Sequence, residues 1–304
     1  MNNPADVFAH LRELSRVRWE RFEHEFARTR KKINAEQVHD LRVSIRRLRA
    51  VIRLKDSLFP DKNIPKLTHP LRKLMTPLGD YRDTQIQLGY LEQIKSPLPY
   101  GLQLYRHRLQ KDSESYKQKI NTLLSEFDIT GYQKKIHKDI LPWKLPPAML
   151  HKQDLNSWPD WQDVLKVSLE KIRKHEEDLF REGGLKDFHQ MRIALKQFRY
   201  LCELLQGLTP VVTVERIKEL ASLQTLMGDI HDQDVLALGC LKFSQTLYPN
   251  HSGYQDIATL VNRIKESRRK KMSRLKKELD SFGESYRVLQ PSVNHNANSS
   301  GKNS

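Results

Sequence analysis

The amino-acid sequence predicts an all-α protein made of two four-helix bundles, and three observations lead to this prediction. Apolar residues recur at helical spacing along almost the whole chain of 304 residues, and the one β-like run, 211–214, is too short for a strand. The pattern of residues 38–60 returns 150 residues later, at 188–210. A proline-rich segment at 141–159 separates the two halves.

The internal repeat indicates a duplication. The segment VHDLRVSIRRLRAVIRLKDSLFP at 38–60 matches FHQMRIALKQFRYLCELLQGLTP at 188–210 in its His, most of its basic and apolar positions and its final Pro. Further along, GDYRD at 79–83 matches GDIHD at 228–232. We therefore expect a first bundle at 1–140, a linker at 141–159, a second bundle at 160–287 and a disordered polar tail at 288–304.

Each half should contain four helices joined by short connections, which is typical of an antiparallel bundle. In the first half the helices are expected near 5–31, 36–58, 64–95 and 101–127. The third should bend or break near Pro77 and Gly79. In the second half the helices are expected near 160–181, 186–206, 213–244 and 255–282.

The second helix of each half carries two parallel rows of residues. One row is apolar and spaced as a packing seam: Val38, Leu41, Ile45, Leu48 and Ile52 in the first half, and Phe188, Met191, Leu195, Phe198 and Cys202 in the second. One residue further on lies a basic row. The first basic row is His39, Arg42, Arg46, Arg49 and Arg53, and the second basic row is His189, Arg192, Lys196 and Arg199.

A row of like charges is unfavourable by itself, because residues three and four apart on a helix repel one another. A single basic row would usually be a solvated helix face, but its recurrence with His leading both times favours a binding function. Arginine offers a planar fork of donors to phosphoryl oxygens, and lysine adds a mobile charge. His39 and His189 fall in the first helical turn, where free backbone N–H groups also favour an anion. The pattern therefore favours a ligand rich in phosphate.

Acidic residues accompany the basic rows in the GDYRD and GDIHD segments. We expect Asp83 and Asp232 to orient the arginines of the rows or to cap a helix. Metal binding is disfavoured because Gln85 stands in the first half where the second half has Asp234. Cys202 and Cys240 have no metal-ligand spacing either, and they suggest a reducing compartment rather than a disulfide framework.

The whole chain is strongly basic, with 53 Lys and Arg against 37 Asp and Glu, a formal charge of +16. Such a balance favours nucleic acid, anionic lipid or another polyanion as partner. The amino terminus lacks the apolar run of a signal peptide, and the chain has no apolar stretch long enough to cross a membrane. We expect a cytoplasmic protein that does not bind membranes.

With these residues in view, the chain resembles the CHAD family, named for its histidine-bearing α-helical domain. The resemblance rests on VHDLRVSIRRLR and FHQMRIALKQFRYLCE, followed by LGDYRD and LQTLMGDIHD, and it extends from about residue 5 to 285. It implies two four-helix bundles related by a pseudo-two-fold, with a basic groove or pore between them that binds inorganic polyphosphate. It also implies no catalysis and no cofactor, with a location in some members at polyphosphate granules.

The resemblance carries binding roles onto most of the two basic rows: His39, Arg42, Arg46, Arg49, His189, Arg192, Lys196 and Arg199. We include Arg53 because it continues the first row. Arg108 and Arg263, on the last helix of each half, are weaker candidates. No protein partner is indicated.

Two other functions fit part of the sequence pattern. A nucleic-acid-binding protein fits the charge, but the basic rows contain no aromatic side chains on which bases could stack. A metal-dependent phosphohydrolase is suggested by the His-Asp pairs at 39–40 and 231–232. Neither pair is repeated in the other half: the first corresponds to His-Gln at 189–190, and the second corresponds to Arg-Asp at 82–83.

Overall fold

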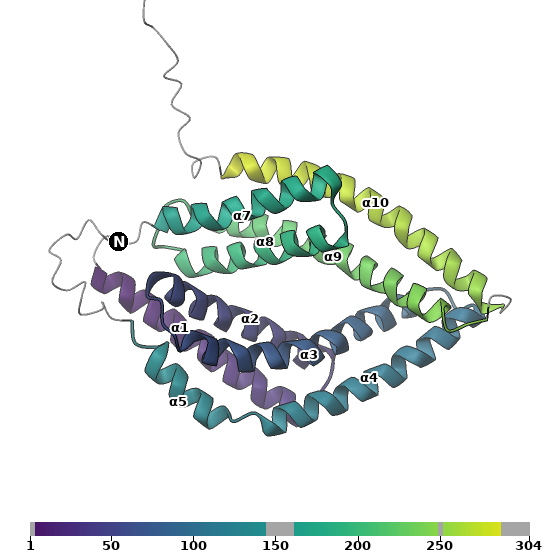
Figure 1. Ribbon diagram of the computed structural model, residues 1–304, viewed down its shortest axis with the longest axis horizontal. Helices are drawn as coiled ribbons and strands as arrows, with labels where there is room; N and C mark the ends of the chain where they lie inside the picture. Colours follow the sequence, from purple (N-terminus) through teal and green to yellow (C-terminus); the bar gives the residue numbers. More distant parts are fainter. Residues whose placement is uncertain (1–3, 144–160, 249–251, 287–304) are drawn as a thin grey trace, which may run out of the picture.

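The computed structural model describes residues 4–143, 161–248 and 252–286, and these residues form an all-helical protein (Figure 1). In the first half, α1 (Pro4–Lys31), α2 (Ala35–Leu58), α3 (Ile64–Glu92) and α4 (Tyr100–Glu126) follow the four expected helices, and a shorter α5 (Ile129–Asp139) comes after them. In the second half, α7 (Trp161–Glu182), α8 (Leu185–Leu205), α9 (Val214–Ser244) and α10 (Gly253–Ser285) follow the expectation. Most of the linker expected at 141–159 and the tail expected at 288–304 lie outside the described residues.

Side chains at the helix starts supply acceptors for backbone N–H groups that the first turn leaves unpaired. At α2 the Asn34 side chain accepts from the Gln37 N–H at 2.9 Å, and at α5 the Asp128 side chain accepts from the Gly131 N–H at 2.8 Å. Thr213 caps α9 in the same way. Helix α3 runs through Pro77 and Gly79 without interruption, so the break that we considered there does not occur.

The two halves form two layers, with α1–α5 on one side and α7–α10 on the other (Figure 1). The main contacts between the halves pair corresponding helices: α2 with α8, α3 with α9 and α4 with α10. An interface in which each element meets its own counterpart is what a two-fold axis produces. The arrangement is therefore consistent with the duplication that the sequence indicates.

The apolar rows of α2 and α8 lie in the core as predicted, since none of their ten side chains is more than 1% exposed. They belong to one large apolar cluster that takes in residues of both halves. A second apolar cluster, which we call the end cluster, lies where α3, α4, α9 and α10 meet. Both halves contribute to it, with residues such as Leu102 and Tyr105 from α4 and Leu260 and Ile264 from α10.

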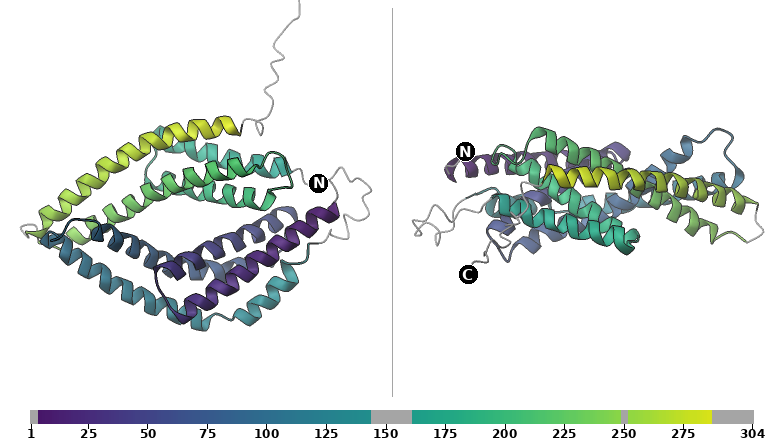
Figure 2. Two further views of the ribbon diagram at one scale, coloured as in Figure 1. Left: turned by 180° about the vertical axis from the view of Figure 1, so that it is seen from behind. Right: turned by 90° about the horizontal axis from the view of Figure 1, so that it is seen from above.

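Helices α4 and α10 form the outer edges of the molecule and converge at one end (Figures 1 and 2). They approach closely because glycines face each other there: a Cβ on Gly101 would overlap the backbone of Gly253. The Gly101 N–H also donates to the Asp256 carboxylate at 3.0 Å. None of the described helices combines the length and the apolar character needed to cross a membrane.

Candidate functional site

The two basic rows come together across the contact between α2 and α8. A cavity of about 290 Å³, which we call the basic cavity, opens between these helices. It is lined by six residues of the basic rows and four others: Arg42, Arg46, Arg49, Arg53, Arg192 and Lys196, with Met75, Ile193, Gln197 and Tyr200. The structure thus brings residues that are 150 positions apart in the sequence, such as Arg42 and Arg192, to the same cavity.

The position of the rows follows from helical geometry. Each basic residue comes one position after a fully buried residue of the apolar row, so it is turned about 100° away from the core. Most of these side chains are therefore half-buried, at the boundary between the core and the cavity. The protein holds some of them in place, since Arg42 Nη1 donates to the Met75 carbonyl at 3.4 Å and Arg46 Nε donates to the Arg42 carbonyl at 3.2 Å.

Several of these arginines bury a donor that the protein does not satisfy. The Nε groups of four row arginines are buried and have no hydrogen-bond acceptor among the described residues: Arg42, Arg49, Arg192 and Arg199. Leaving a charged donor buried and unpaired is costly, so proteins usually avoid it. Three of these arginines, Arg42, Arg49 and Arg192, line the basic cavity, so guanidinium groups from both halves lie beside any anion held there.

The basic cavity has too little negative charge to balance its cations. Burial and the positive charges of Arg192 and Arg46 lower the pKa of Lys196 to about 6. Burial and the charge of Arg46 also lower the pKa of Arg42 to about 10. Both shifts show that a positive charge is disfavoured at these atoms. An anion in the cavity would remove this penalty.

The two histidines lie at the N-terminal end of their rows and are exposed; neither lines the basic cavity. Burial and the charges of Arg82 and Arg46 lower the pKa of His39. The pKa of His189 is lowered by burial and by Arg192 and Lys196. The positive charges of the rows therefore disfavour protonation of the histidine at the start of each helix.

A third histidine, which the sequence analysis did not include in the site, lies near His189. The ring centroids of His189 and His231 are 6.0 Å apart. Burial and the charges of Arg192 and Lys196 lower the pKa of His231 to about 3. The repeat could not reveal this residue, because Arg82 occupies the corresponding position in the first half.

The carboxylates of Asp83 and Asp232 lie within electrostatic reach of the basic rows. Burial raises the pKa of Asp83, while Arg42 and Arg192 act in the opposite direction. Burial likewise raises the pKa of Asp232, and Arg192 again opposes the shift. The two aspartates also repel each other, which places all these charges in one region between the halves.

The second basic row ends at Glu203, which binds arginines from three helices. Its Oε1 pairs with Arg199 of α8 at 3.1 Å. Its Oε2 pairs with Arg18 of α1 at 3.4 Å and with Arg47 of α2 at 3.3 Å. Glu203 thus ties α8 to the first half, and Arg199 is engaged in this ion pair instead of lining the basic cavity.

Arg72 on α3 is exposed and does not line the basic cavity, but it lies within electrostatic reach of the first basic row. Burial lowers the pKa of Arg49 and of Arg53, and the positive charge of Arg72 lowers both further. The repeat gave no signal for it, since the corresponding residue in the second half is Ala221.

The two weaker candidates lie outside the basic cavity. Arg108 is exposed, pairs with Asp112 at 3.0 Å and lines a different cavity of about 500 Å³ between α3, α4 and the C-terminal half of α9. Arg263 is exposed on α10. Their participation in binding stays a prediction.

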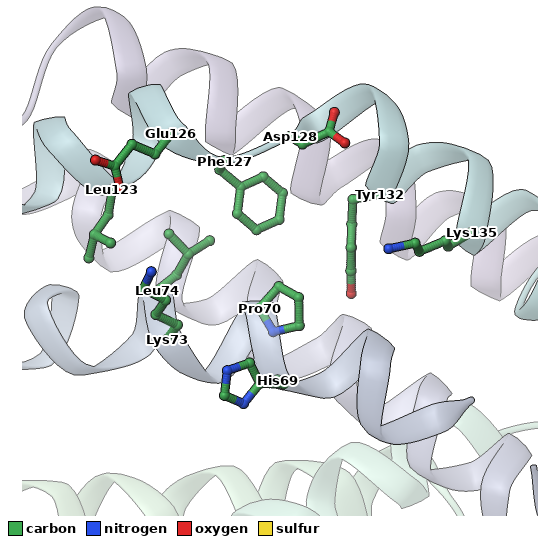
Figure 3. Close-up of a pocket in the computed structure, with 10 residues that line it drawn as sticks. All are labelled: His69, Pro70, Lys73, Leu74, Leu123, Glu126, Phe127, Asp128, Tyr132 and Lys135. Carbon is green, nitrogen blue, oxygen red and sulfur yellow. The ribbon is translucent and has the colours of Figure 1, made fainter. Parts of the chain in front are cut away.

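A further cavity, of about 320 Å³, lies within the first half and has a different character. Figure 3 shows His69 and Lys73 on α3 facing Phe127 and Tyr132, with Lys135 beside them. Its cations share the cavity with the carboxylates of Glu126 and Asp128. Because α5 forms one wall and has no counterpart among the described helices of the second half, this cavity is not part of the repeated site.

Within the described part of the chain, no three His, Cys, Asp or Glu side chains are grouped so that they could hold a metal ion. 

Comparison with known proteins supports one family. The family model of the CHAD domain matches residues 16–238. The crystal structure of the CHAD domain from the plant Ricinus communis is similar, with a TM-score of 0.68 and 18% identity over 93% of this chain and 92% of that one. PptA from Streptomyces chartreusis has a TM-score of 0.65 and 14% identity over 92% of this chain and 99% of that one. No curated protein matches the sequence.

Proposed function

Because the chain belongs to the CHAD domain family, which is associated with polyphosphate, we propose that it binds inorganic polyphosphate in the basic cavity and performs no catalysis. The observation that carries this proposal is a cavity lined by six cationic side chains from α2 and α8 and by no carboxylate. Polyphosphate presents phosphoryl oxygens in unbroken succession, so one chain can satisfy donors from both rows. The bound polymer would also recruit the protein to polyphosphate granules in the cytoplasm.

A charge reversal tests where the polymer binds. Arg46→Glu and Lys196→Glu, one in each row, should each weaken binding of long-chain polyphosphate by at least about tenfold. Their melting temperatures should stay close to that of the native protein, because both side chains are only half-buried and line the cavity instead of packing in the core. Arg12→Glu, an exposed residue of α1 outside every cavity described above, is the matched control and should bind normally.

The measurement is a titration of polyphosphate, double-stranded DNA and RNA at one salt concentration, with melting curves for each variant. If Arg46→Glu and Lys196→Glu unfold, the rows are structural and the site assignment is wrong. If Arg12→Glu weakens binding as much as they do, the protein attracts polyanions by net charge alone. Nucleic acid binding more tightly than polyphosphate would favour the nucleic-acid function.

The absence of catalysis is tested separately. Incubating the protein with polyphosphate and Mg²⁺ or Mn²⁺ should release no phosphate above the rate without protein. Release that depends on His231 or Asp232 would contradict the proposal and favour the metal-dependent phosphohydrolase.

A further inference from the structure

A second cavity adjoins the basic cavity at its Arg53 end. This apolar cavity, of about 510 Å³, lies between α2, α7 and α8. Three residues line both cavities: Arg53, Gln197 and Tyr200. The two cavities are therefore neighbours along the contact between α2 and α8, with these three side chains between them.

The walls of the apolar cavity differ in chemistry from the basic rows. Much of its lining is apolar and includes Leu54, Val164, Val167 and Leu201. Two charged residues of α7, Asp163 and Lys171, also line it. Hydroxyl groups of Ser57 on α2 and Ser168 on α7 stand among these side chains, and the Gln197 amide lies where the cavities join. Inorganic polyphosphate has no apolar group, so it would make no use of these walls.

We propose that the two cavities together form a site for a nucleoside 5′-polyphosphate such as ATP. Its phosphates would bind the basic rows and its base would lie in the apolar cavity. Arg53, which lines both, is placed to contact the first phosphate or to lay its planar guanidinium on the base. The proposal rests on the proposed function, since the same rows would hold the phosphates.

The two volumes suit this class of ligand. Small-molecule sites are commonly clefts of roughly 300–1,000 Å³ with apolar walls and a few polar groups that fix orientation. The Ser168 hydroxyl and the Gln197 amide offer both donors and acceptors, which suit the polar edge of a base. An alkyl chain would make no use of these polar groups, so a phosphorylated lipid fits less well.

The test compares ATP with tripolyphosphate in the same calorimeter, without divalent cations. The two ligands have the same number of phosphates, and ATP carries less negative charge. A purely electrostatic site would therefore prefer tripolyphosphate. We expect ATP to bind at least about tenfold more tightly, because its base removes apolar surface from water. Equal or weaker binding of ATP overturns the inference.

Two neutral substitutions separate the cavities. Val167→Asn changes a side chain that is 53% exposed in the apolar cavity, so it should not disturb the fold. It should reduce the affinity for ATP by at least about fivefold and leave that for tripolyphosphate within about twofold. Val17→Asn makes the same change at a residue of α1 that is 40% exposed and lines neither cavity, and it should affect neither ligand.

Ser168→Leu provides a second variant, because the larger side chain fills part of the apolar cavity without changing charge. It too should lower the affinity for ATP alone. If both variants bind ATP like the native protein, the base does not occupy this cavity and the inference is wrong. Long-chain polyphosphate is titrated into the native protein and every variant as well. A native protein that does not bind the polymer would contradict the proposed function. A native protein that binds the polymer but shows no preference for ATP over tripolyphosphate contradicts only the further inference.

Discussion

Lys196 is the row residue whose charge depends most on whether an anion is present. Burial and its cationic neighbours lower its pKa to about 6, so at neutral pH it is largely uncharged in the empty protein. A bound phosphate would favour the protonated amine and raise this pKa toward its ordinary value. Binding therefore takes up a proton, and affinity should fall as the pH rises from about 6 toward the pKa of the complex.

The Lys196→Arg variant tests this linkage, because arginine stays protonated throughout the range. The native protein should lose affinity for long-chain polyphosphate between pH 7 and 8.5, by up to about tenfold per pH unit if one proton is taken up. The Lys196→Arg protein should show a much flatter profile in that window. Calorimetry in buffers of different ionisation enthalpy counts the protons directly.

The double variant His39→Gln, His189→Gln serves as the control for Lys196. Both histidines have a lowered pKa, so their contribution belongs below about pH 6.5 and should leave the slope above pH 7 unchanged. If the slope above pH 7 disappears in the histidine variant and persists in Lys196→Arg, proton uptake belongs to the histidines.

At the level of the helix, α3 and α9 differ in what surrounds their equivalent glycines. A Cβ on Gly79 of α3 would lie 2.8 Å from Nη1 of Arg42, whereas a Cβ on Gly228 of α9 meets nothing within 4 Å. Gly79 therefore leaves room for an arginine that lines the basic cavity, and Gly228 has no such role.

Alanine at these two positions should separate stability from binding. Both Gly79→Ala and Gly228→Ala should stabilise their helices by up to about 1 kcal/mol, because alanine is the better helix former. Only Gly79→Ala should weaken polyphosphate binding, by roughly threefold to tenfold, since the Arg42 guanidinium must move. Thermal unfolding and titration of both variants check this, and equal binding would show that the position of Arg42 does not matter.

The eight long helices were predicted from the sequence because each buries a row of apolar residues at helical spacing. The additional helix α5 was not, since it has 11 residues and only Tyr132 and Ile136 are buried among them. Its place is fixed by distant partners: the Tyr132 hydroxyl donates to the Leu67 carbonyl at 2.8 Å, and its ring contacts Phe127. Such contacts leave no periodic signal in a short segment.

The candidate site was predicted where it repeats and missed where it does not. Arg42 and Arg192 occupy equivalent positions, which a comparison of the two halves detects. Arg72 corresponds to an alanine in the other half, and His231 corresponds to an arginine, so the comparison singles out neither. Nothing in the local sequence around Glu203 indicates that arginines from α1 and α2 would meet it. Spacing along one helix cannot reveal which residues other helices bring.

For the whole molecule, the length of the ligand should govern affinity. The first basic row extends roughly 20 Å along its helix and the second roughly 15 Å, so orthophosphate can meet only one or two donors at once. A polymer loses its translational and rotational entropy only once, at the first contact, and then binds successive residues. It also displaces many counterions. Long-chain polyphosphate should bind at least about a hundredfold more tightly than tripolyphosphate, with DNA between them.

Titrations with a ladder of chain lengths at two salt concentrations measure this dependence. Affinity for the long polymer should drop steeply as salt rises, while that for orthophosphate changes little. Tripolyphosphate that binds as tightly as the polymer would indicate a compact pocket instead of an extended surface.

The end cluster should hold the two halves together even when the backbone between them is cut. Its members come from α3 and α4 on one side and α9 and α10 on the other, so either half alone would expose this apolar surface to water. Glu203 adds a second attachment between the halves. We therefore expect that a protein cut between residues 143 and 161 elutes as one particle on gel filtration. Two halves that are produced separately should associate when mixed, and the complex should bind polyphosphate. Fragments that elute apart, each folded, would show that the halves are independent units joined only by peptide bonds.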